Sequence, residues 1–376
     1  MTERAPAGER EVDAAAERLG QLREALRTRI VGQEDVVRQV TAAVLAEGHG
    51  LIVGLPGLAK TLLVSSIAEL LSLEFKRIQF TPDLMPSDIT GASIISEEAP
   101  GQRNYKFLEG PIFSNIILAD EINRTPPKTQ AALMEAMEER QVSAGGKRLV
   151  LERPFFVLAT QNPIEQEGTY PLPVSQLDRF MLEITIDYPT TEEEFRIVVL
   201  TTSTYSSRLP RLFSREEVLG LVDLTRRIEV PADLLDYASR IVRSTRPSSS
   251  LASEFTKESV AWGGGPRAAQ SMVALARAYA LMAGRNRIEP DDLHAVAVPT
   301  LRHRILLRYH AQAEGVRAEE IVEKCLRSLP GSLYRPAPEE PVATKPGRFF
   351  GWPRKQTGIQ TAGIARPASG GPRPSR

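Results

Sequence analysis

The sequence is poor in cysteine, in long apolar runs and in net charge, and each shortage excludes a class of protein. Cys325 is the only cysteine among 376 residues, so no disulfide can form within the chain, which fits a reducing compartment. The longest apolar runs, such as residues 116–119, fall far short of the roughly 20 residues that a membrane-spanning helix needs. The charged N-terminus lacks the apolar segment of a signal peptide. We therefore predict a cytoplasmic protein without a transmembrane segment.

The charges of the chain are balanced, because Lys plus Arg and Asp plus Glu number 47 each. Composition alone therefore gives no reason to expect a nucleic-acid partner. A hydrophobic share of 42% and a charged share of 25% are typical of a folded, water-soluble protein. Because single hydrophobic cores seldom grow beyond roughly 250 to 300 residues, the length predicts about two domains.

The pattern of apolar residues divides the chain into four segments. Residues 1–10 are predicted to be flexible, and residues 11–188 to form an α/β domain with a parallel sheet. Residues 189–330 show helical periodicity without a buried-strand run, which predicts a smaller, all-helical domain. Residues 331–376 are rich in Pro, Gly, Arg and Ser and are predicted to be disordered. The sheet is predicted from five short apolar runs, at residues 51–54, 75–80, 116–119, 155–159 and 182–186. Gly145 and Gly146, between QVS and KRLVL, predict a separate two-stranded hairpin.

The segment GLPGLAKT at residues 54–61 is predicted to bind the phosphates of ATP. Gly54 and Gly57 let the backbone turn so that its N–H groups point at phosphate oxygens, and the following helix adds its positive end. Lys60 is expected to contact the β and γ phosphates, and the Thr61 hydroxyl suits Mg²⁺. The alternative is a Gly/Pro turn before an ordinary helix. The predicted nucleotide-binding residues here are Gly54, Leu55, Pro56, Gly57, Leu58, Ala59, Lys60, Thr61 and Leu62.

Ala59 departs from the usual phosphate-loop pattern, because glycine normally precedes the lysine. We expect Ala59 to adopt helical or near-helical dihedral angles and to place its methyl group close to the phosphates, which a small residue can do.

Two adjacent carboxylates, Asp120 and Glu121, end the apolar run in NIILADEINR at residues 115–124. At the carboxyl end of a parallel strand they would face the same crevice as the phosphate loop. Asp120 is predicted to hold Mg²⁺ through the water shell of the ion, and Glu121 to orient or deprotonate the attacking water. The alternative is an acidic strand end that caps the next helix. The second carboxylate favours hydrolysis over binding alone.

At this point the sequence resembles the MoxR branch of the AAA+ ATPases over roughly residues 20 to 310. The resemblance implies a P-loop AAA+ αβα core with a five-stranded parallel sheet and a smaller helical lid, with an insertion at about residues 88–110. The segments that carry it are VGQED at 31–35, RIQFTPDLMPSDITG at 77–91, DEINRTPPKTQAALMEAMEERQV at 120–142, ATQNPIEQEGTYPLPVSQLDRF at 159–180 and LRHR at 301–304.

The resemblance also implies roles for residues away from the phosphate loop. Val31, Gly32 and Gln33 resemble the segment that contacts adenine. Asn162 matches a polar sensor at the end of a strand that lies between the phosphate-loop strand and the strand of Asp120. This sensor holds the attacking water and the γ-phosphate together. Without the resemblance, Asn162 followed by Pro163 could equally begin a turn.

The resemblance implies that two arginines complete an active site. Arg179 matches the arginine finger that enters the site of a neighbouring subunit, for which its planar charged fork is suited. Taken alone, Asp178 and Arg179 would more often be a solvated or locally paired couple. Arg267 in GGGPRAAQ resembles the second sensor, although the family usually has a sequence closer to GASPR, so its action in cis or in trans stays open. The alternative for Arg267 is a helix-surface arginine.

The predicted function is a Mg²⁺-dependent ATPase that forms a ring, of six subunits as the family implies, and remodels a protein client. The resemblance further implies a partner with a von Willebrand factor A domain. One alternative is a DNA-associated motor or loader, favoured by a basic cluster in the lid. Another alternative is a non-catalytic, nucleotide-dependent scaffold. The basic cluster comprises Arg285, Arg287, Arg302, Arg304 and Arg308.

Overall fold

The computed structural model describes residues 6–99, 102–144, 147–164, 168–202 and 209–329. The predicted disordered tail at 331–376 and the Gly145-Gly146 turn lie outside the described residues. No helix among the described residues is both long enough and apolar enough to cross a membrane.

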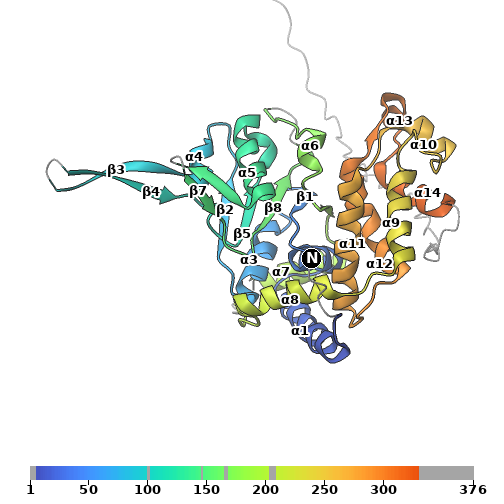
Figure 1. The fold of residues 1–376 in the computed structure, drawn as a ribbon, viewed down its shortest axis with the longest axis horizontal. Helices are drawn as coiled ribbons and strands as arrows, with labels where there is room; N and C mark the ends of the chain where they lie inside the picture. Colours follow the sequence, from blue (N-terminus) through green and yellow to red (C-terminus); the bar gives the residue numbers. More distant parts are fainter. Residues whose placement is uncertain (1–5, 100–101, 145–146, 165–167, 203–208, 330–376) are drawn as a thin grey trace, which may run out of the picture. The chain divides into compact units, whose positions relative to one another are not determined.

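A five-stranded sheet forms the centre of the N-terminal part, with the strand order β2-β5-β8-β1-β9 (Figure 1). All four neighbouring pairs run parallel. The predicted α/β fold with a five-stranded parallel sheet is therefore confirmed. The strands are β1 (Gly50–Gly54), β2 (Phe75–Gln79), β5 (Ile116–Asp120), β8 (Phe156–Gln161) and β9 (Leu182–Ile186).

The helices of this part begin earlier than predicted, because α1 starts at Glu9 and not at residue 11. Glu9 and Glu11 lie in the first turn, where negative charge is favourable at the helix N-terminus. Residues 9 and 10 are thus helical, which corrects the prediction of a flexible segment over residues 1–10. The helices are α1 (Glu9–Arg27), α2 (Glu34–Leu45), α3 (Lys60–Leu70), α4 (Pro86–Thr90), η1 (Ile122–Arg124, a 3₁₀ turn), α5 (Pro127–Glu139) and α6 (Val174–Leu177).

Two antiparallel hairpins are separate from the central sheet. β3 (Gly91–Ala99) pairs with β4 (Gln102–Glu109) inside the predicted insertion at residues 88–110. β6 (Gln141–Ala144) pairs with β7 (Lys147–Val150), where a hairpin was predicted around two glycines.

The C-terminal part is mainly helical, as predicted, but it also contains a short antiparallel pair of strands, β10 (Val260–Trp262) with β11 (Leu306–Leu307). Strands this short leave no apolar run that a sequence pattern could detect. The helices are α7 (Thr191–Thr202), α8 (Arg215–Arg227), α9 (Ala232–Ser244), α10 (Glu254–Ser259), α11 (Pro266–Met282), α12 (Pro290–Leu301), η2 (Arg302–Arg304), α13 (Tyr309–Ala313) and α14 (Ala318–Ser328).

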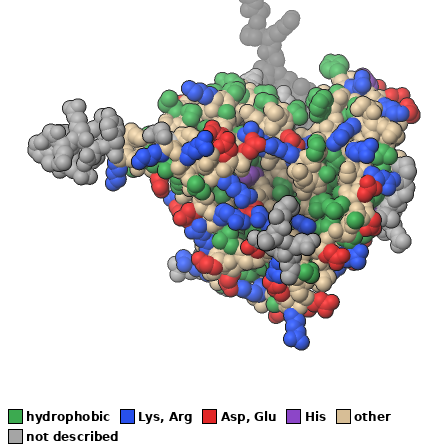
Figure 2. Space-filling view, viewed as in Figure 1, with side chains coloured by type: hydrophobic (Ala, Val, Ile, Leu, Met, Phe, Trp, Pro, Cys, Tyr) green, Lys and Arg blue, Asp and Glu red, His purple; other side chains and the backbone are tan. Residues whose placement is uncertain are grey.

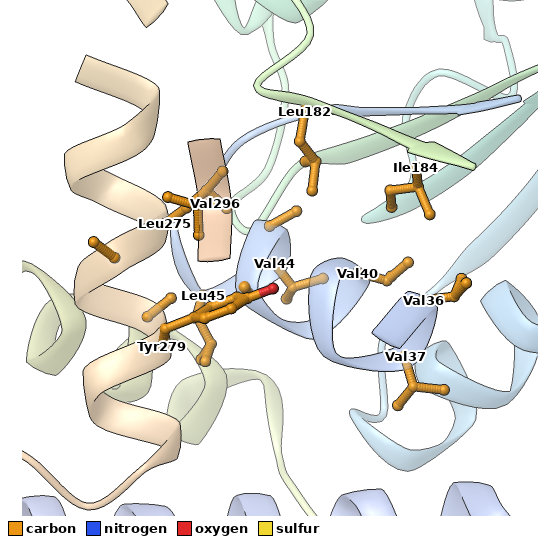
Figure 3. Close-up of a cluster of buried hydrophobic side chains, with 14 of the residues drawn as sticks. Val36, Val37, Val40, Val44, Leu45, Leu182, Ile184, Leu275, Tyr279 and Val296 are labelled. Carbon is orange, nitrogen blue, oxygen red and sulfur yellow. The ribbon is translucent and has the colours of Figure 1, made fainter. Parts of the chain in front are cut away.

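One apolar cluster joins the sheet to the helical lid (Figure 3). Helix α2 supplies valines at three- and four-residue spacing, and Val40 is fully buried. These valines pack between Leu182 and Ile184 of β9 on one side and the lid helices α11 and α12 on the other. Burial of each such side chain stabilises the fold by about 1.5 to 3 kcal/mol. The lid is therefore anchored to the core by ordinary hydrophobic packing.

A buried carboxylate adds a polar tie at the same junction. The Glu47 side chain, which is 2% exposed, lies between α2 and β1 and forms ion pairs with three arginines, Arg140, Arg153 and Arg226. Burial alone would raise the pKa of Glu47, but the hydrogen bond from Arg153 and the charges of Arg140 and Arg226 outweigh it and lower the pKa below its ordinary value. Arg226 belongs to α8, so this cluster links the core to the lid.

Glu47→Gln is expected to lower the free energy of unfolding at pH 7 by about 2 kcal/mol, because the buried carboxylate loses its charge-assisted hydrogen bonds to three partly exposed arginines. Urea unfolding followed by circular dichroism measures the effect. Since the folded-state pKa is depressed, the stabilisation is present above the unfolded-state pKa and is lost as pH falls through the folded-state value. The difference between variant and wild type should therefore shrink in acid. Glu152→Gln, at an exposed ion pair with Arg215, is the control; equal losses for both variants would contradict the prediction.

Candidate nucleotide site

The phosphate-loop candidate connects β1 to α3 at the carboxyl edge of the sheet. It borders a cavity of about 440 Å³ that is also lined by residues from β2, β5 and β8. Gly57 has a φ of 81°, and a Cβ at this position would point into open space. The glycine is therefore required for the backbone turn and not for packing, as predicted. The lining residues are Pro56, Gly57, Leu58, Ala59, Lys60, Thr61, Leu62, Arg77, Asp120, Glu121, Thr160 and Asn162.

Gly54 has a different role from the predicted one. It is the last residue of β1 and does not have a positive φ, so it does not provide the turn. A Cβ at Gly54 would lie 2.8 Å from the carbonyl oxygen of Ile186 on β9, which explains the glycine by close strand packing. Its carbonyl oxygen accepts a hydrogen bond of 2.5 Å from Lys60 Nζ. Gly54 and Leu55 do not line the cavity.

Lys60 is the first residue of α3 and lines the cavity. Partial burial lowers the pKa of its ammonium group, although the nearby charges of Asp120 and Glu121 favour the protonated form. The bond to the Gly54 carbonyl satisfies one donor and leaves Nζ beside the cavity.

Ala59 adopts the left-handed conformation, with φ 54° and ψ 22°, and not the right-handed helical dihedrals that its position before a helix suggested. The loop must reverse its direction immediately before α3, and this turn is what glycine provides in the usual pattern. For alanine the left-handed conformation costs roughly 1–2 kcal/mol, because Cβ approaches the carbonyl oxygen.

Ala59→Gly is expected to raise the free energy of unfolding by roughly 0.5–1 kcal/mol, since the removed strain exceeds the extra entropy of an unfolded glycine. Ala59→Val should lower it, because a β-branched residue tolerates positive φ poorly. Urea unfolding of the two variants beside wild type measures both shifts. A loss of stability in the glycine variant would contradict the strain argument.

Asp120 lies at the end of β5 and is fixed on both oxygens. Thr160 Oγ1 donates to Oδ1 at 2.5 Å, and the Arg77 guanidinium donates to Oδ2 at 2.6 Å and 3.0 Å. Thr160 comes from β8 and Arg77 from β2, the two strands that flank β5. The sheet order therefore places a hydroxyl and a guanidinium around the carboxylate that the sequence predicts to serve Mg²⁺.

Glu121 is in the left-handed conformation with φ 57°, which is rare for a non-glycine residue. Its backbone N–H donates to Thr160 Oγ1 at 2.9 Å. The carboxylate accepts hydrogen bonds from Gln79 Nε2 at 2.7 Å and from Arg124 at 3.1 Å. Backbone strain of this kind concentrates at functional sites, where surrounding bonds hold it in place. The conformation turns the carboxylate toward the cavity that Lys60 also lines.

Asn162 follows β8, which lies between β5 and β1 in the sheet as predicted. It is buried and lines the cavity together with Asp120 and Glu121. Its Oδ1 also accepts a hydrogen bond of 3.2 Å from the Ile164 backbone N–H. The two readings of the sequence are thus compatible, because Asn162 begins a turn and faces the cavity. The turn leaves its side-chain amide N–H₂ available as a donor.

The predicted adenine segment lies between α1 and α2 and reaches the phosphate loop through one contact. Gln33 Nε2 donates to the Leu58 carbonyl oxygen at 3.4 Å. Gly32 and Gln33 line a neighbouring hollow with Glu193 and Arg196 of α7, whereas Val31 is buried. The three residues do not line the phosphate cavity itself, but they are joined to its rim.

Arg179 and Arg267 lie away from the phosphate cavity of their own chain. Both line a second cavity of about 440 Å³, and both form ion pairs with Glu138 of α5. The Arg179 guanidinium is 2.8 Å from Glu138 Oε2, and it donates to the Met134 carbonyl oxygen at 2.7 Å. Arg267, grouped with the nucleotide-binding residues by sequence, therefore does not contribute to its own chain's phosphate cavity in this structure. The physical reason is that the Arg267 guanidinium, in the first turn of α11, is paired with Glu138 of α5.

The donor set of the phosphate cavity suits Mg²⁺ and a triphosphate. Thr61 and Asp120 offer hard oxygen ligands, and Lys60 with the loop N–H groups offers positive charge to phosphates. Within the described ranges, no cluster of three or more His, Cys, Asp or Glu residues could hold a metal by itself. A site with one carboxylate and one hydroxyl is what Mg²⁺ uses when phosphates and water complete its shell. The residues present therefore fit MgATP.

Four residues that line these two cavities or contact a lining residue escaped the sequence analysis: Arg77, Gln79, Thr160 and Glu138. Arg77, Gln79 and Thr160 lie on β2 and β8, the strands on either side of β5. The sequence feature that could have identified them is their position at or near the carboxyl ends of these strands. Glu138 has no such signal, because its partners come from distant parts of the chain.

Comparison with known proteins agrees with this geometry. Residues 49–182 match the model of the ATPase family associated with various cellular activities (AAA), and residues 252–325 match the AAA lid domain. Chaperone MoxR1 of Mycobacterium tuberculosis is 39% identical over 84% of this chain and 83% of its own length. The uncharacterized protein YeaC of Bacillus subtilis is 40% identical over 85% of this chain and 96% of its own.

A solved structure gives the same result in three dimensions. A Cytophaga hutchinsonii protein superposes with a TM-score of 0.80 at 37% identity, covering 85% of this chain and 97% of that protein. With the identity to chaperone MoxR1 and the matched AAA and lid models, this protein belongs to the MoxR-like AAA+ ATPases.

Proposed function

We propose that this protein is a Mg²⁺-dependent ATPase that hydrolyses ATP as a ring, by the family's example a hexamer, in which each subunit completes the active site of its neighbour. The observation that carries the proposal is the position of Arg179. It lies at a second cavity, away from the phosphate loop of its own chain, and its side chain is 29% exposed. An arginine in that position can stabilise the developing phosphate charge only in another subunit.

The residues of the phosphate cavity divide the chemistry among them. Lys60 and the loop N–H groups bind the phosphates, while Thr61 and Asp120 hold Mg²⁺, which when bound neutralises phosphate charge. Glu121 orients the attacking water and accepts its proton as the new bond to the γ-phosphorus forms and ADP leaves. Asn162 donates to the γ-phosphate or the water. Val31, Gly32 and Gln33 contact the adenine.

Glu121 must change partners before it can act in this way. In this structure Gln79 and Arg124 donate hydrogen bonds to its Oε2. An attacking water has to compete with these two donors for the lone pairs of the same oxygen. A γ-phosphate that draws Arg124 or Gln79 toward itself would release the carboxylate.

The proposed role of hydrolysis is to remodel a protein client, with a von Willebrand factor A domain protein as the expected adaptor. Support comes from the relative named chaperone MoxR1, which shares 39% identity across most of both chains. The hairpins β3–β4 and β6–β7 lie outside the central sheet and are the elements we expect to contact the client.

The lid arginines do not favour the alternative of a DNA motor, because internal contacts engage four of the five. Arg285 pairs with Asp292 at 2.6 Å, and Arg304 is buried against Asp178. Arg302 contacts Thr185 and Glu319, and Arg308 donates to the Val260 carbonyl oxygen. Figure 2 shows acidic and basic side chains interspersed on the viewed face, without the single-sign field that tracks a phosphate backbone.

ATP turnover measured against protein concentration, with subunit mass determined in parallel, tests the proposal. Specific activity should rise as rings form, because a separated subunit lacks the arginine of its neighbour. Equal specific activity for monomers would contradict the shared site. ATP-dependent assembly without any turnover would instead favour the non-catalytic scaffold.

A further inference from the structure

Glu138 brings together two arginines that the fold delivers from different domains. Arg179 follows α6 in the core, whereas Arg267 lies in the first turn of the lid helix α11. Arg179 binds one carboxylate oxygen, Oε2, and Arg267 binds the other, Oε1. The carboxylate thus fixes the spacing of two guanidinium groups that neither helix could fix alone.

The chemistry of this cluster resembles that of a bound phosphate. A carboxylate and a phosphate both present paired oxygens to which guanidinium forks bind with charge-assisted hydrogen bonds. The hydrogen bond from Arg267 is the main cause that lowers the pKa of Glu138, so the group stays ionised at neutral pH. The side chains of Glu138 and Arg267 are 39% and 48% exposed, so an incoming phosphate can reach the guanidinium groups.

The backbone that carries Arg179 is also fixed to the lid. Arg304 of η2, with a side chain only 3% exposed, binds Asp178 Oδ1 at 2.8 Å and the Phe180 carbonyl oxygen at 2.7 Å. These contacts hold both residues that flank Arg179. The lid therefore holds the backbone on both sides of Arg179. The Arg179 side chain is held separately, by Met134 and Glu138 of α5.

We propose that Glu138 is a positioning residue that holds Arg179 and Arg267 as a pair for the γ-phosphate bound to the neighbouring subunit. The inference rests on the proposed function, since it requires a shared active site. It adds that a core carboxylate sets the spacing of the two arginines. Glu138 acts through the two arginines and not as a group that reacts with ATP.

Glu138→Gln is expected to lower turnover about tenfold while leaving the KM for ATP unchanged, because a misplaced catalytic group lowers the rate without weakening binding by the phosphate loop. Glu138→Asp, which retains the charge, should keep most of the activity. Glu135→Gln, an exposed position on the same helix, is the matched control and should behave as wild type. Ring mass is measured for every variant before kinetics. Unchanged or increased turnover in Glu138→Gln would overturn the inference.

Mixed rings separate a trans effect from damage to the fold. Glu138→Gln subunits keep Glu121, and Glu121→Gln subunits keep Glu138, so a mixed interface can hold one intact site. Mixing should raise activity several-fold above the mean of the two separate preparations. Arg179→Ala mixed with Glu121→Gln tests the shared site itself. A gain with Arg179→Ala but none with Glu138→Gln would overturn the inference alone, whereas no gain in either mixture would overturn the proposed function as well.

Discussion

Glu121→Gln should bind ATP with unchanged affinity and hydrolyse it about 10³-fold more slowly than wild type. Glutamine keeps the size of the side chain and its contact to Gln79, but it cannot accept a proton from water. The phosphate loop does not involve this side chain, so binding should persist. Single-turnover hydrolysis of radiolabelled ATP gives the rate, and equilibrium dialysis gives the affinity.

The control for that experiment lies at the opposite end of the same sheet. Glu74→Gln removes a half-exposed carboxylate that pairs with Lys76 just before β2, and it should leave both quantities unchanged. If Glu121→Gln retained wild-type turnover, Glu121 would have no part in proton transfer, and another group would have to activate the water.

Arg179→Ala is expected to lower turnover by about 10³-fold or more, with ATP affinity and ring mass preserved. Its guanidinium lies outside the phosphate cavity of its own chain. Removal of the guanidinium should therefore affect the transition state in the neighbouring subunit and not the binding of ATP by its own subunit. Arg179→Lys should recover little, because an ammonium group cannot make the two parallel bonds of a guanidinium fork. Steady-state turnover at a protein concentration that gives full assembly measures the effect.

Arg317→Ala provides the comparison for that variant. Arg317 is 72% exposed and pairs only loosely with Glu320, at 3.5 Å, so its loss should not change turnover. Wild-type activity in assembled Arg179→Ala rings would remove the arginine finger from the mechanism and with it the need for a ring.

The sequence predicts the parts of the fold and site that depend on short-range patterns. Apolar runs bounded by turns identify the five strands, and the Asp120-Glu121 pair falls at a strand end because the run stops there. Lys60 and Thr61 follow from the loop spacing. The resemblance places Asn162 at the end of a strand between the phosphate-loop strand and the Asp120 strand, and the observed position of β8 between β1 and β5 agrees.

The remaining features depend on spatial neighbours far apart in the chain. Thr160 reaches Asp120 because β8 lies beside β5, and Arg77 reaches it from β2 on the other side. The position of Arg267 depends on how the lid packs on α2 and β9, an arrangement that hydrophobic periodicity does not specify. Strand order and domain packing are long-range properties, so single-sequence patterns could not give the contacts of Glu138.

The backbone of Ala59 has a consequence for how such proteins are found. A search pattern written in amino-acid letters requires glycine before the lysine and passes over this loop. The torsion angles at residue 59, φ 54° and ψ 22°, express the requirement more directly, and glycine is only the residue that meets it at least cost. Asparagine and aspartate also tolerate this region. A pattern that scores how well a residue tolerates the left-handed backbone conformation at this position would also retrieve nucleotide-binding loops that lack the glycine but keep the same backbone geometry.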